Sequence, residues 1–489
     1  MNHNWYFRSD TTTAAAYPRY VENPFTLVAS EPLSTFSTDV DTASYANVRR
    51  FLNQNQLPPR DAVRIEELLN YFSYAYAPPT GDQPFAAHLE VAGCPWAPEH
   101  RLLRVGLKGR VLKEDKRPPS NFVFLIDVSG SMSPAVRLPL IKESLRQLVK
   151  RMTENDRVGI VVYAGTSGTV LESTSAVNKE LILAAIDRLE AGGSTNGGEG
   201  IQRAYDLAVA NFIKGGVNRV ILCTDGDFNV GITDRGQLLK LIEDRAKSGV
   251  FLTTLGVGDD NFKDATLQQL ADKGNGNYHY LDTVAEGHKV LVEQMNATLV
   301  TIAKDVKVQI EFNPAQAAAY RLIGYEKRIL AKEDFNNDAK DAGEIGAGHT
   351  VTVLYEVVPA GVPVRGAVDP LKYQPNPPPV LTSGPAKPAT GSKELLTLKL
   401  RYKAPDGDTS KLLEFPLTDS RVPFARASVD FKFASAVAEF GMLLKDSPFK
   451  GTATFDSALE LAGEGRGDDT HGYRAEFLNL VAKAKELKR

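Results

Sequence analysis

The sequence lacks several features that would identify common classes of function. It has no run of about 18 consecutive apolar residues, so no segment is predicted to span a membrane. Lys and Arg form no cluster, and the formal net charge of −3 gives no electrostatic basis for binding nucleic acid. The seven histidines are scattered and show neither the spacing of a zinc site nor a Ser-His-Asp arrangement. These absences argue against membrane-spanning, nucleic-acid-binding and histidine-based catalytic classes.

Cysteine content and the amino terminus leave the cellular compartment open. The two cysteines are Cys94 and Cys223, and Cys223 lies in the apolar run 220–223, where a small buried side chain is expected. Nothing in the pattern brings the two segments together, so no disulfide is predicted. Residues 1–24 are polar and lack the charged-then-apolar order of a signal segment. The protein is therefore either cytoplasmic or has had a signal segment removed.

From residue 121 onward, short apolar strands alternate with amphipathic helices. The expected strands cover residues 121–127, 157–163, 217–224, 250–257 and 277–281. The expected helices cover residues 135–151, 178–189, 198–213, 234–247, 263–273 and 284–301. Short continuous apolar strands between helices are typical of a mostly parallel, doubly wound sheet. Right-handed crossovers then place the loops that follow these strands along one edge of the sheet.

Strand-like segments flank this block on both sides, at residues 85–112 and 306–417. We predict that they pair into one β-sandwich with the α/β domain inserted between them, so that the fold class is α/β plus all-β. At 489 residues the chain is also too long for one ordinary domain. The predicted parts are an irregular lead (1–35), N-terminal helices and first sandwich strands (36–118), the α/β domain (119–303), the remaining sandwich (304–425) with a Pro-rich loop (360–393), and a C-terminal helical region (426–489).

The segment Asp127-Val128-Ser129-Gly130-Ser131 follows the apolar strand directly. It offers one carboxylate and two hydroxyls on alternating positions at the carboxyl end of a strand, where open α/β sheets place their ligands. Oxygen ligands of this kind suit Mg²⁺, Mn²⁺ or Ca²⁺ rather than zinc. Asp127, Ser129 and Ser131 are therefore candidate ligands of a hard divalent cation.

Two further loops add candidate ligands at the same edge. The glycine-rich loop 191–198 contains Thr195 just before a helix, and Asp225 follows the strand 217–224. Loops after adjacent parallel strands converge, so both side chains should reach the turn that begins at Asp127. The sequence thus predicts one metal site built from residues far apart along the chain.

Together, the Asp-x-Ser-x-Ser turn, the Gly-Gly-Ser-Thr loop and the Thr-Asp-Gly segment resemble the metal-ion-dependent adhesion site of von Willebrand factor type A (VWA) domains. The resemblance implies that Ser129 and Ser131 bind the metal directly and that Thr195 binds it directly or through water. Asp127 and Asp225 would often act through water. It further implies a Mg²⁺ ion, with Mn²⁺ or Ca²⁺ as alternatives, whose open position accepts an Asp or Glu side chain of a partner protein.

The flanks resemble a narrower group, the bacterial YfbK-like VWA proteins. The similar segments are residues 37–45, residues 322–326 and residues 341–349. This resemblance implies a cell-envelope location, often as a lipoprotein, although no lipid-attachment cysteine stands near the start of the chain. A cytoplasmic location is the alternative.

Other functions are weighed against this prediction. Asp227 beside Asp225 suggests a catalytic carboxylate pair, but no substrate pocket or tuned pair supports a hydrolase, so the protein is predicted not to be an enzyme. Asp39 and Asp41 are expected to cap the helix 43–54 rather than bind metal. Two alternatives stay open: an envelope protein that the metal only stabilises, and a VWA subunit that works with a separate ATPase, since this chain has no phosphate loop.

Overall fold

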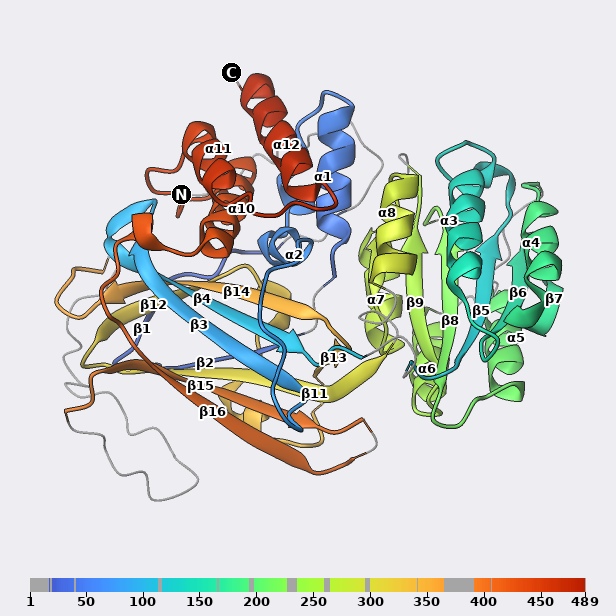
Figure 1. The fold of residues 1–489 in the computed structure, drawn as a ribbon, viewed down its shortest axis with the longest axis horizontal. Coiled ribbons are helices and arrows are strands. Elements are labelled where there is room, and N and C mark those ends of the chain that lie inside the picture. The colour runs from blue at the N-terminus through green and yellow to red at the C-terminus, as the bar shows by residue number, and fades with distance from the viewer. Residues whose placement is uncertain are drawn as a thin grey trace, which may run out of the picture. The chain divides into compact units, whose positions relative to one another are not determined.

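The structure is a computed structural model, and it divides into two compact units (Figure 1). Unit 1 is built from Pro118–Met295, and unit 2 from Arg19–Arg117 and Asn296–Arg489. The described residues are 17, 20–38, 41–112, 117–164, 167–192, 198–226, 235–258, 264–294, 300–340, 342–364, 391–405 and 407–488. Along the chain, unit 1 is therefore inserted between the two segments that form unit 2.

Unit 1 contains a sheet whose six described strands have the order β10-β9-β8-β5-β6-β7. The strands are β5 (Ser120–Asp127), β6 (Arg157–Tyr163), β7 (Ser167–Ser175), β8 (Val217–Thr224), β9 (Phe251–Gly256) and β10 (Tyr278–Tyr280). Every neighbouring pair is parallel except β6 and the edge strand β7. Strand β7 is not predicted from the sequence, because its Ser- and Thr-rich residues show no apolar pattern.

Helices join these strands and cover the sheet of unit 1 (Figure 1). They are α3 (Leu138–Arg151), α4 (Lys179–Asp187), α5 (Gly198–Ala210), α6 (Arg235–Ala246), α7 (Asp264–Lys273) and α8 (Val284–His288). Helices α4 and α8 both pack on α3, which connects β5 to β6. Helices α5, α6 and α7 belong to connections that run the other way along the sheet, from β7 to β8, from β8 to β9 and from β9 to β10. With right-handed crossovers, the two groups lie on opposite faces.

The helix predicted over residues 284–301 does not reach its predicted end, and its residues 295–299 lie outside the described residues. Helix α8 is followed by a π-helical turn, Lys289–Glu293, and Thr301 already belongs to the strand β11 (Thr301–Phe312) of unit 2. The prediction was wrong because the apolar helical pattern of 284–294 runs directly into an apolar strand, and periodicity alone separates the two poorly.

Two antiparallel sheets form the β part of unit 2 (Figure 1). The first has the order β1 (Thr26–Leu27), β12 (Ala317–Ile323), β14 (Thr350–Pro359), β4 (Ala97–Gly109), β3 (Phe85–Cys94). The second has the order β13 (Gly343–Gly346), β11, β15 (Glu394–Lys403), β16 (Ser410–Thr418), and β2 (Leu33–Ser37) also pairs with β11. Segments from before and after unit 1 therefore share both sheets.

The two sheets contribute side chains to one hydrophobic core. Val105 and Val353 from the first sheet and Val308 and Leu398 from the second are all fully buried in it. The expected fold class is confirmed: a doubly wound, mostly parallel sheet is flanked in sequence by β-rich segments, and a helical region ends the chain.

A second core of unit 2 joins helices from both ends of the chain. These helices are α1 (Ala43–Asn53), α2 (Ile65–Asn70), α10 (Val429–Lys445), α11 (Phe455–Glu464) and α12 (Tyr473–Leu487). Phe433 of α10 makes edge-to-face ring contacts with Phe72 and Phe477, with ring centres 4.8 and 5.4 Å apart. Ser428 begins α10 by accepting a hydrogen bond from the Phe431 amide. The N-terminal helices and the C-terminal helical region thus form one packed layer.

The irregular lead predicted for residues 1–35 is wrong at two places. Thr26–Leu27 pairs with β12, and Leu33–Ser37 pairs with β11. Both segments are short edge strands that gain their partners only from distant parts of the chain. A local apolar pattern is therefore too weak to reveal them.

The capping role predicted for Asp41 is also wrong. Thr42 is the N-cap residue of α1, and a carboxylate oxygen of Asp41 lies 3.3 Å from a guanidinium nitrogen of Arg328. Asp39 lies outside the described residues. The Asp41 carboxylate therefore joins α1 to the segment that follows β12.

Cys94 and Cys223 are free, buried thiols, and burial raises the pKa of both. Among the helices of the described residues, none combines the length and apolar character needed to cross a bilayer.

Candidate metal centre

The candidate ligands lie where the strand order of unit 1 reverses. The chain leads from β5 to β6 on one side of this point and from β8 to β9 on the other. Open α/β sheets bind ligands beyond the carboxyl ends of the strands at such a switch point. Strand β5 ends at Asp127 and β8 ends at Thr224, and the preceding residues Ile126 and Cys223 pair in register. The two strands therefore bring Asp127 and Asp225 to the same edge.

The turn after β5 holds its carboxylate and hydroxyls in a fixed arrangement. Asp127 is fully buried, and its Oδ1 accepts a hydrogen bond of 2.9 Å from the backbone amide of Ser129. Its Oδ2 accepts a hydrogen bond of 3.2 Å from the Thr224 hydroxyl on β8. The hydroxyl oxygens of Ser129 and Ser131 lie 3.1 Å apart, with Ser129 buried and Ser131 exposed. The turn thus leads from a buried carboxylate to a hydroxyl at the surface.

Asp225 faces an arginine that the sequence analysis did not predict. The Nη1 atom of Arg137 donates to Asp225 Oδ2 at 2.8 Å and to the backbone carbonyl of Ser131 at 2.6 Å. Both charged side chains are buried, with 8% and 5% of their surfaces exposed. Arg137 directly precedes α3, so its guanidinium connects the loop after β5 with the loop after β8. Arginine is not a metal ligand, and no motif in the sequence indicated this contact.

Thr195 and Asp227 lie outside the described residues. The glycine-rich loop that contains Thr195 begins next to the site, since the amide of Gly192 donates to the carbonyl of Val128 at 2.7 Å. The structure therefore brings together Asp127, Ser129, Ser131 and Asp225, and the ligand role of Thr195 stays a prediction.

The charges of the site favour a bound cation. Burial raises the pKa of Asp127 above its ordinary value, and the negative charge of Asp225 raises it further, against hydrogen bonds from Ser129 that lower it. Tyr163 on β6 is fully buried, and its pKa is raised well above the ordinary value, first by burial and then by the charge of Asp127. A divalent cation at this edge would offset the repulsion between the two carboxylates.

The donor set fits a hard divalent ion. Two ligand oxygens at about 2.1 Å from Mg²⁺ and at right angles to each other stand about 3 Å apart. The Ser129 and Ser131 hydroxyls are hydrogen-bonded to each other at 3.1 Å, which is compatible with this separation. Within the described residues, no three carboxylate, imidazole or thiol side chains gather around one point, so the site depends on hydroxyls beside its two carboxylates. Such a set suits Mg²⁺ or Mn²⁺ better than zinc.

Thr224 belongs to the Thr-Asp-Gly segment of the motif, but no role beside Asp127 was predicted for it. Its hydroxyl donates to Asp127 and accepts a hydrogen bond of 3.2 Å from the amide of Gly226. Thr224 thus orients one predicted ligand and the loop of another. A hydroxyl residue directly before the loop aspartate was the available signal.

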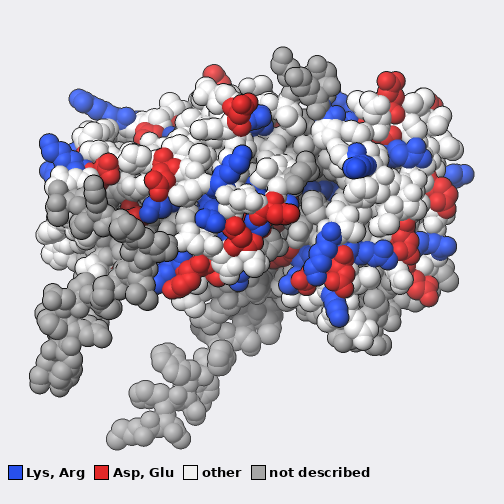
Figure 2. Space-filling model, turned by 90° about the horizontal axis from the view of Figure 1, so that it is seen from below, with Lys and Arg blue, Asp and Glu red and all other residues white. Residues whose placement is uncertain are grey.

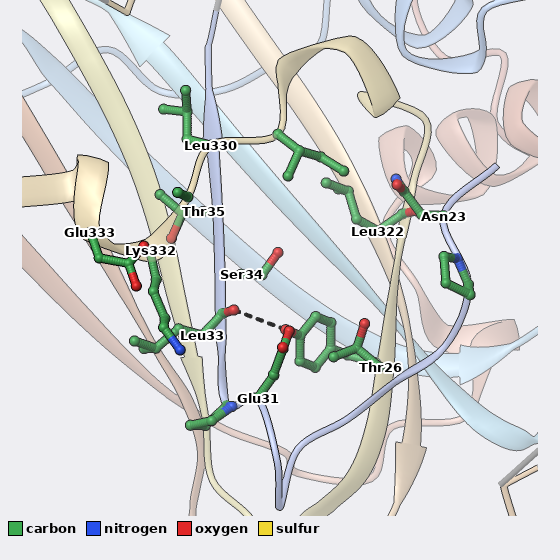
Figure 3. A pocket seen from close by; sticks show the side chains of 15 residues that line it. Asn23, Thr26, Glu31, Leu33, Ser34, Thr35, Leu322, Leu330, Lys332 and Glu333 are labelled. Carbon is green, nitrogen blue, oxygen red and sulfur yellow. Dashed lines mark hydrogen bonds between the residues drawn. The ribbon is translucent and has the colours of Figure 1, made fainter. Parts of the chain in front are cut away.

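Unit 2 contains a separate hollow of about 340 Å³ between β1, β2 and the segment after β12 (Figure 3). The Tyr320 hydroxyl donates to the carbonyl of Leu33 at 3.0 Å, and the Asn23 amide donates to the carbonyls of Leu322 and Gly324. These polar groups are bonded within the protein, so they do not point to a ligand. The candidate site is therefore placed in unit 1.

Three family descriptions match consecutive parts of the chain. "von Willebrand factor" matches residues 11–104, "von Willebrand factor type A domain" matches residues 121–296, and "Uncharacterized protein YfbK, C-terminal" matches residues 297–487. The second of these corresponds closely to unit 1, and the other two fall on the segments that build unit 2.

The similar proteins include a relative that matches nearly the whole chain and relatives that match only part of it. The "Uncharacterized protein YfbK" of Escherichia coli (strain K12) is 46% identical over 477 residues, which cover 96% of this chain and 81% of that protein. The inter-alpha-trypsin inhibitor heavy chain H1 of Sus scrofa is 28% identical over 151 residues, 29% of this chain and 16% of its own. A solved von Willebrand factor type A structure from Catenulispora acidiphila is 14% identical, with a TM-score of 0.41, and the match covers 96% of this chain and 90% of that one. The identity over nearly the whole chain, together with the matches on unit 1 and on both flanks, shows that the chain belongs to the YfbK family of proteins with a von Willebrand factor type A domain.

Proposed function

We propose that the protein binds a partner protein through a divalent cation held by Asp127, Ser129, Ser131, Thr195 and Asp225. The observation that carries this proposal is the convergence of two carboxylates and two hydroxyls at the switch point of the sheet. The oxygen-only character of the donors supports Mg²⁺ as the ion, with Mn²⁺ or Ca²⁺ as alternatives.

The partner would contribute an Asp or Glu side chain to the metal. Neutral hydroxyls supply no charge to the ion, and Mg²⁺ takes six oxygens in a near-octahedral array. If Asp127 and Asp225 act through water, as the family resemblance implies, at least one position stays available to an outside oxygen. A carboxylate fills that position and adds the negative charge that the hydroxyls lack.

Recognition through one ion agrees with the mixed charge of the protein surface. On the face drawn in Figure 2, Lys and Arg side chains stand among Asp and Glu side chains. The formal net charge of the chain is −3. A net charge this small gives no strong long-range field of one sign, so the proposal assigns specificity to the metal.

Calorimetry with Mg²⁺ and Mn²⁺ on Ser131→Ala and Ser133→Ala tests the metal site. Both serines are exposed and lie two residues apart, but the Ser133 hydroxyl donates to the Gly130 carbonyl at 2.9 Å instead of facing Ser129. We expect Ser131→Ala to lose binding and Ser133→Ala to bind as the wild type does. If the wild-type protein binds neither ion at millimolar concentration, the proposal is refuted.

Capture of partners from an envelope extract, with and without chelator, separates binding from a purely structural role. We expect a partner that chelator and Asp127→Asn both release, and whose own Asp or Glu is required. If chelator lowers the melting temperature but leaves capture unchanged, the metal only stabilises the loops. A hydrolase would instead show turnover that depends on Asp225 or Asp227.

We also propose a cell-envelope location, as the resemblance of the flanking segments to YfbK-like proteins implies. Fractionation of cells that express the untagged gene at its native level tests it. Recovery of the protein in the cytoplasmic fraction alone would contradict the proposed location. It would not bear on the proposed metal site.

A further inference from the structure

Arg137 occupies a position in the site that no metal-binding motif accounts for. Its side chain is buried, and one guanidinium nitrogen donates both to Asp225 and to the Ser131 carbonyl. The loop after β9 closes over the same side chain: a Cβ atom at Gly258 would stand 2.7 Å from the Arg137 Nε atom. Loops after three neighbouring strands therefore enclose one fixed positive charge beside the predicted ligands.

This charge changes the electrostatic balance of the site. Asp127 and Asp225 carry two buried negative charges, and Arg137 neutralises one of them. A divalent ion added to this set leaves an excess of one positive charge, whereas the same ion without Arg137 would leave none. Uncompensated charge is costly beside buried side chains such as Asp127, Asp225 and Arg137, so the loaded site is stabilised by one additional anionic ligand.

We propose that Arg137 determines the specificity of the site by coupling metal binding to the arrival of a carboxylate. The guanidinium opposes binding of the bare metal, because it repels the ion and already holds Asp225. The carboxylate of the partner restores neutrality, so metal and carboxylate each strengthen the binding of the other. This inference rests on the proposed function, and it adds that Arg137 makes the site prefer a carboxylate over a neutral oxygen group.

Calorimetric titration with manganese chloride, in acetate and in chloride buffer of equal ionic strength, tests this role. Acetate serves as the carboxylate probe. For the wild type we expect acetate to tighten Mn²⁺ binding by about fivefold or more. For Arg137→Met we expect Mn²⁺ alone to bind about tenfold tighter than in the wild type, with no effect of acetate. Arg137→Lys keeps the charge and should retain the dependence on acetate.

A second variant displaces the Arg137 guanidinium and keeps its charge, although alanine at the positive φ of Gly258 strains the loop. Gly258 has a φ of +93°, and in Gly258→Ala the added methyl group pushes against the Arg137 guanidinium without removing its charge. We expect a smaller change in the same direction as in Arg137→Met. Melting curves in chelator show which variants are folded.

The outcomes separate the inference from the proposed function. Wild-type protein that binds no Mn²⁺ overturns both. Wild-type protein that binds Mn²⁺, with Arg137→Met showing the same affinity and the same acetate dependence, overturns only the role of Arg137. Equal tightening by acetate in the wild type and in Arg137→Met, whatever the affinity for the metal alone, also overturns it.

Discussion

Each unit buries a carboxylate on a strand: Glu356 lies within β14 of unit 2, and Asp127 ends β5 of unit 1. The pKa values of these two carboxylates are shifted in opposite directions. In unit 2, Glu356 on β14 accepts hydrogen bonds from Trp96 at 3.0 Å, His100 at 2.6 Å and Arg321 at 3.1 Å. Burial acts to raise the pKa of Glu356, but the hydrogen bond from His100 and the charge of Arg321 outweigh it, and the pKa is lowered. In unit 1, the pKa of Asp127 is raised.

The difference lies in what surrounds each charge. The donors of Glu356 include a buried arginine, so the carboxylate is stabilised by the protein itself. Asp127 accepts from a backbone amide and a hydroxyl and has the carboxylate of Asp225 as its charged neighbour. A satisfied carboxylate maintains the fold, whereas an under-neutralised one is suited to a cation from solution. Four predictions follow from this contrast, in order of decreasing effect.

The largest effect is expected for Glu356→Gln in unit 2. This change leaves Arg321 buried, with only 1% of its side chain exposed, and without its negative partner. We expect the free energy of unfolding to fall by about 3–5 kcal/mol, measured by urea denaturation in chelator. The control is Glu311→Gln, which breaks a pair with Lys399 whose acidic side chain is 51% exposed, and which should cost less than about 1 kcal/mol. Equal losses in the two variants would contradict the role assigned to Glu356.

A pH-dependent effect is expected at Glu439 on α10. Burial raises the pKa of Glu439 from 4.5 to about 7, against one hydrogen bond from Ser457. The folded state therefore binds the proton more strongly than the unfolded state does, and stability is retained at acid pH and lost as the pH rises from 4.5 through 7.

Glu439→Gln removes this loss because glutamine stays neutral. Relative to the wild type, the variant should gain about 3 kcal/mol in free energy of unfolding between pH 4.5 and pH 8. Urea denaturation at the two pH values measures the gain. Parallel stability curves for the variant and the wild type would show that Glu439 is not protonated near neutral pH.

A smaller effect is expected when the hydroxyl that orients Asp127 is removed. Thr224→Val keeps the shape of the side chain and loses the hydrogen bond to Asp127. We expect the affinity for Mn²⁺ to fall about 10-fold to 100-fold, because second-shell partners set ligand orientation. Thr254→Val is the control: it removes a buried hydroxyl that bonds the Leu267 carbonyl in the same sheet, and it should leave metal affinity unchanged.

The smallest effect on stability is expected for Asp127→Asn in chelator. Neutralising a buried carboxylate whose pKa is raised removes repulsion with Asp225, so the free energy of unfolding should change by less than about 1 kcal/mol. The same variant should fail to bind metal. A fall in the free energy of unfolding as large as that of Glu356→Gln would contradict the different roles assigned to Asp127 and Glu356.

Much of unit 1 could be predicted from the sequence because its signals are local. The apolar run before Asp127 predicts a buried strand, and parallel strands carry their loops to one edge, so Asp127 and Asp225 could be placed together. Strands β2 and β7 could not be predicted in this way. Both are polar edge strands without a clear apolar alternation: β2 pairs with the distant β11, and β7 pairs with the neighbouring β6.

By itself, the sequence determined the alternation of strands and helices, the Asp127 turn with its oxygen ligands and the resemblance to VWA domains. Only the tertiary structure decided which charges meet. Arg137 reaches Asp225, and Arg321 reaches Glu356, across long stretches of chain. The physical reason is that periodicity and turn motifs are encoded within a few residues, whereas charge compensation depends on distances between side chains that only folding brings together. The same carboxylate chemistry therefore yields a structural contact in unit 2 and a candidate metal centre in unit 1.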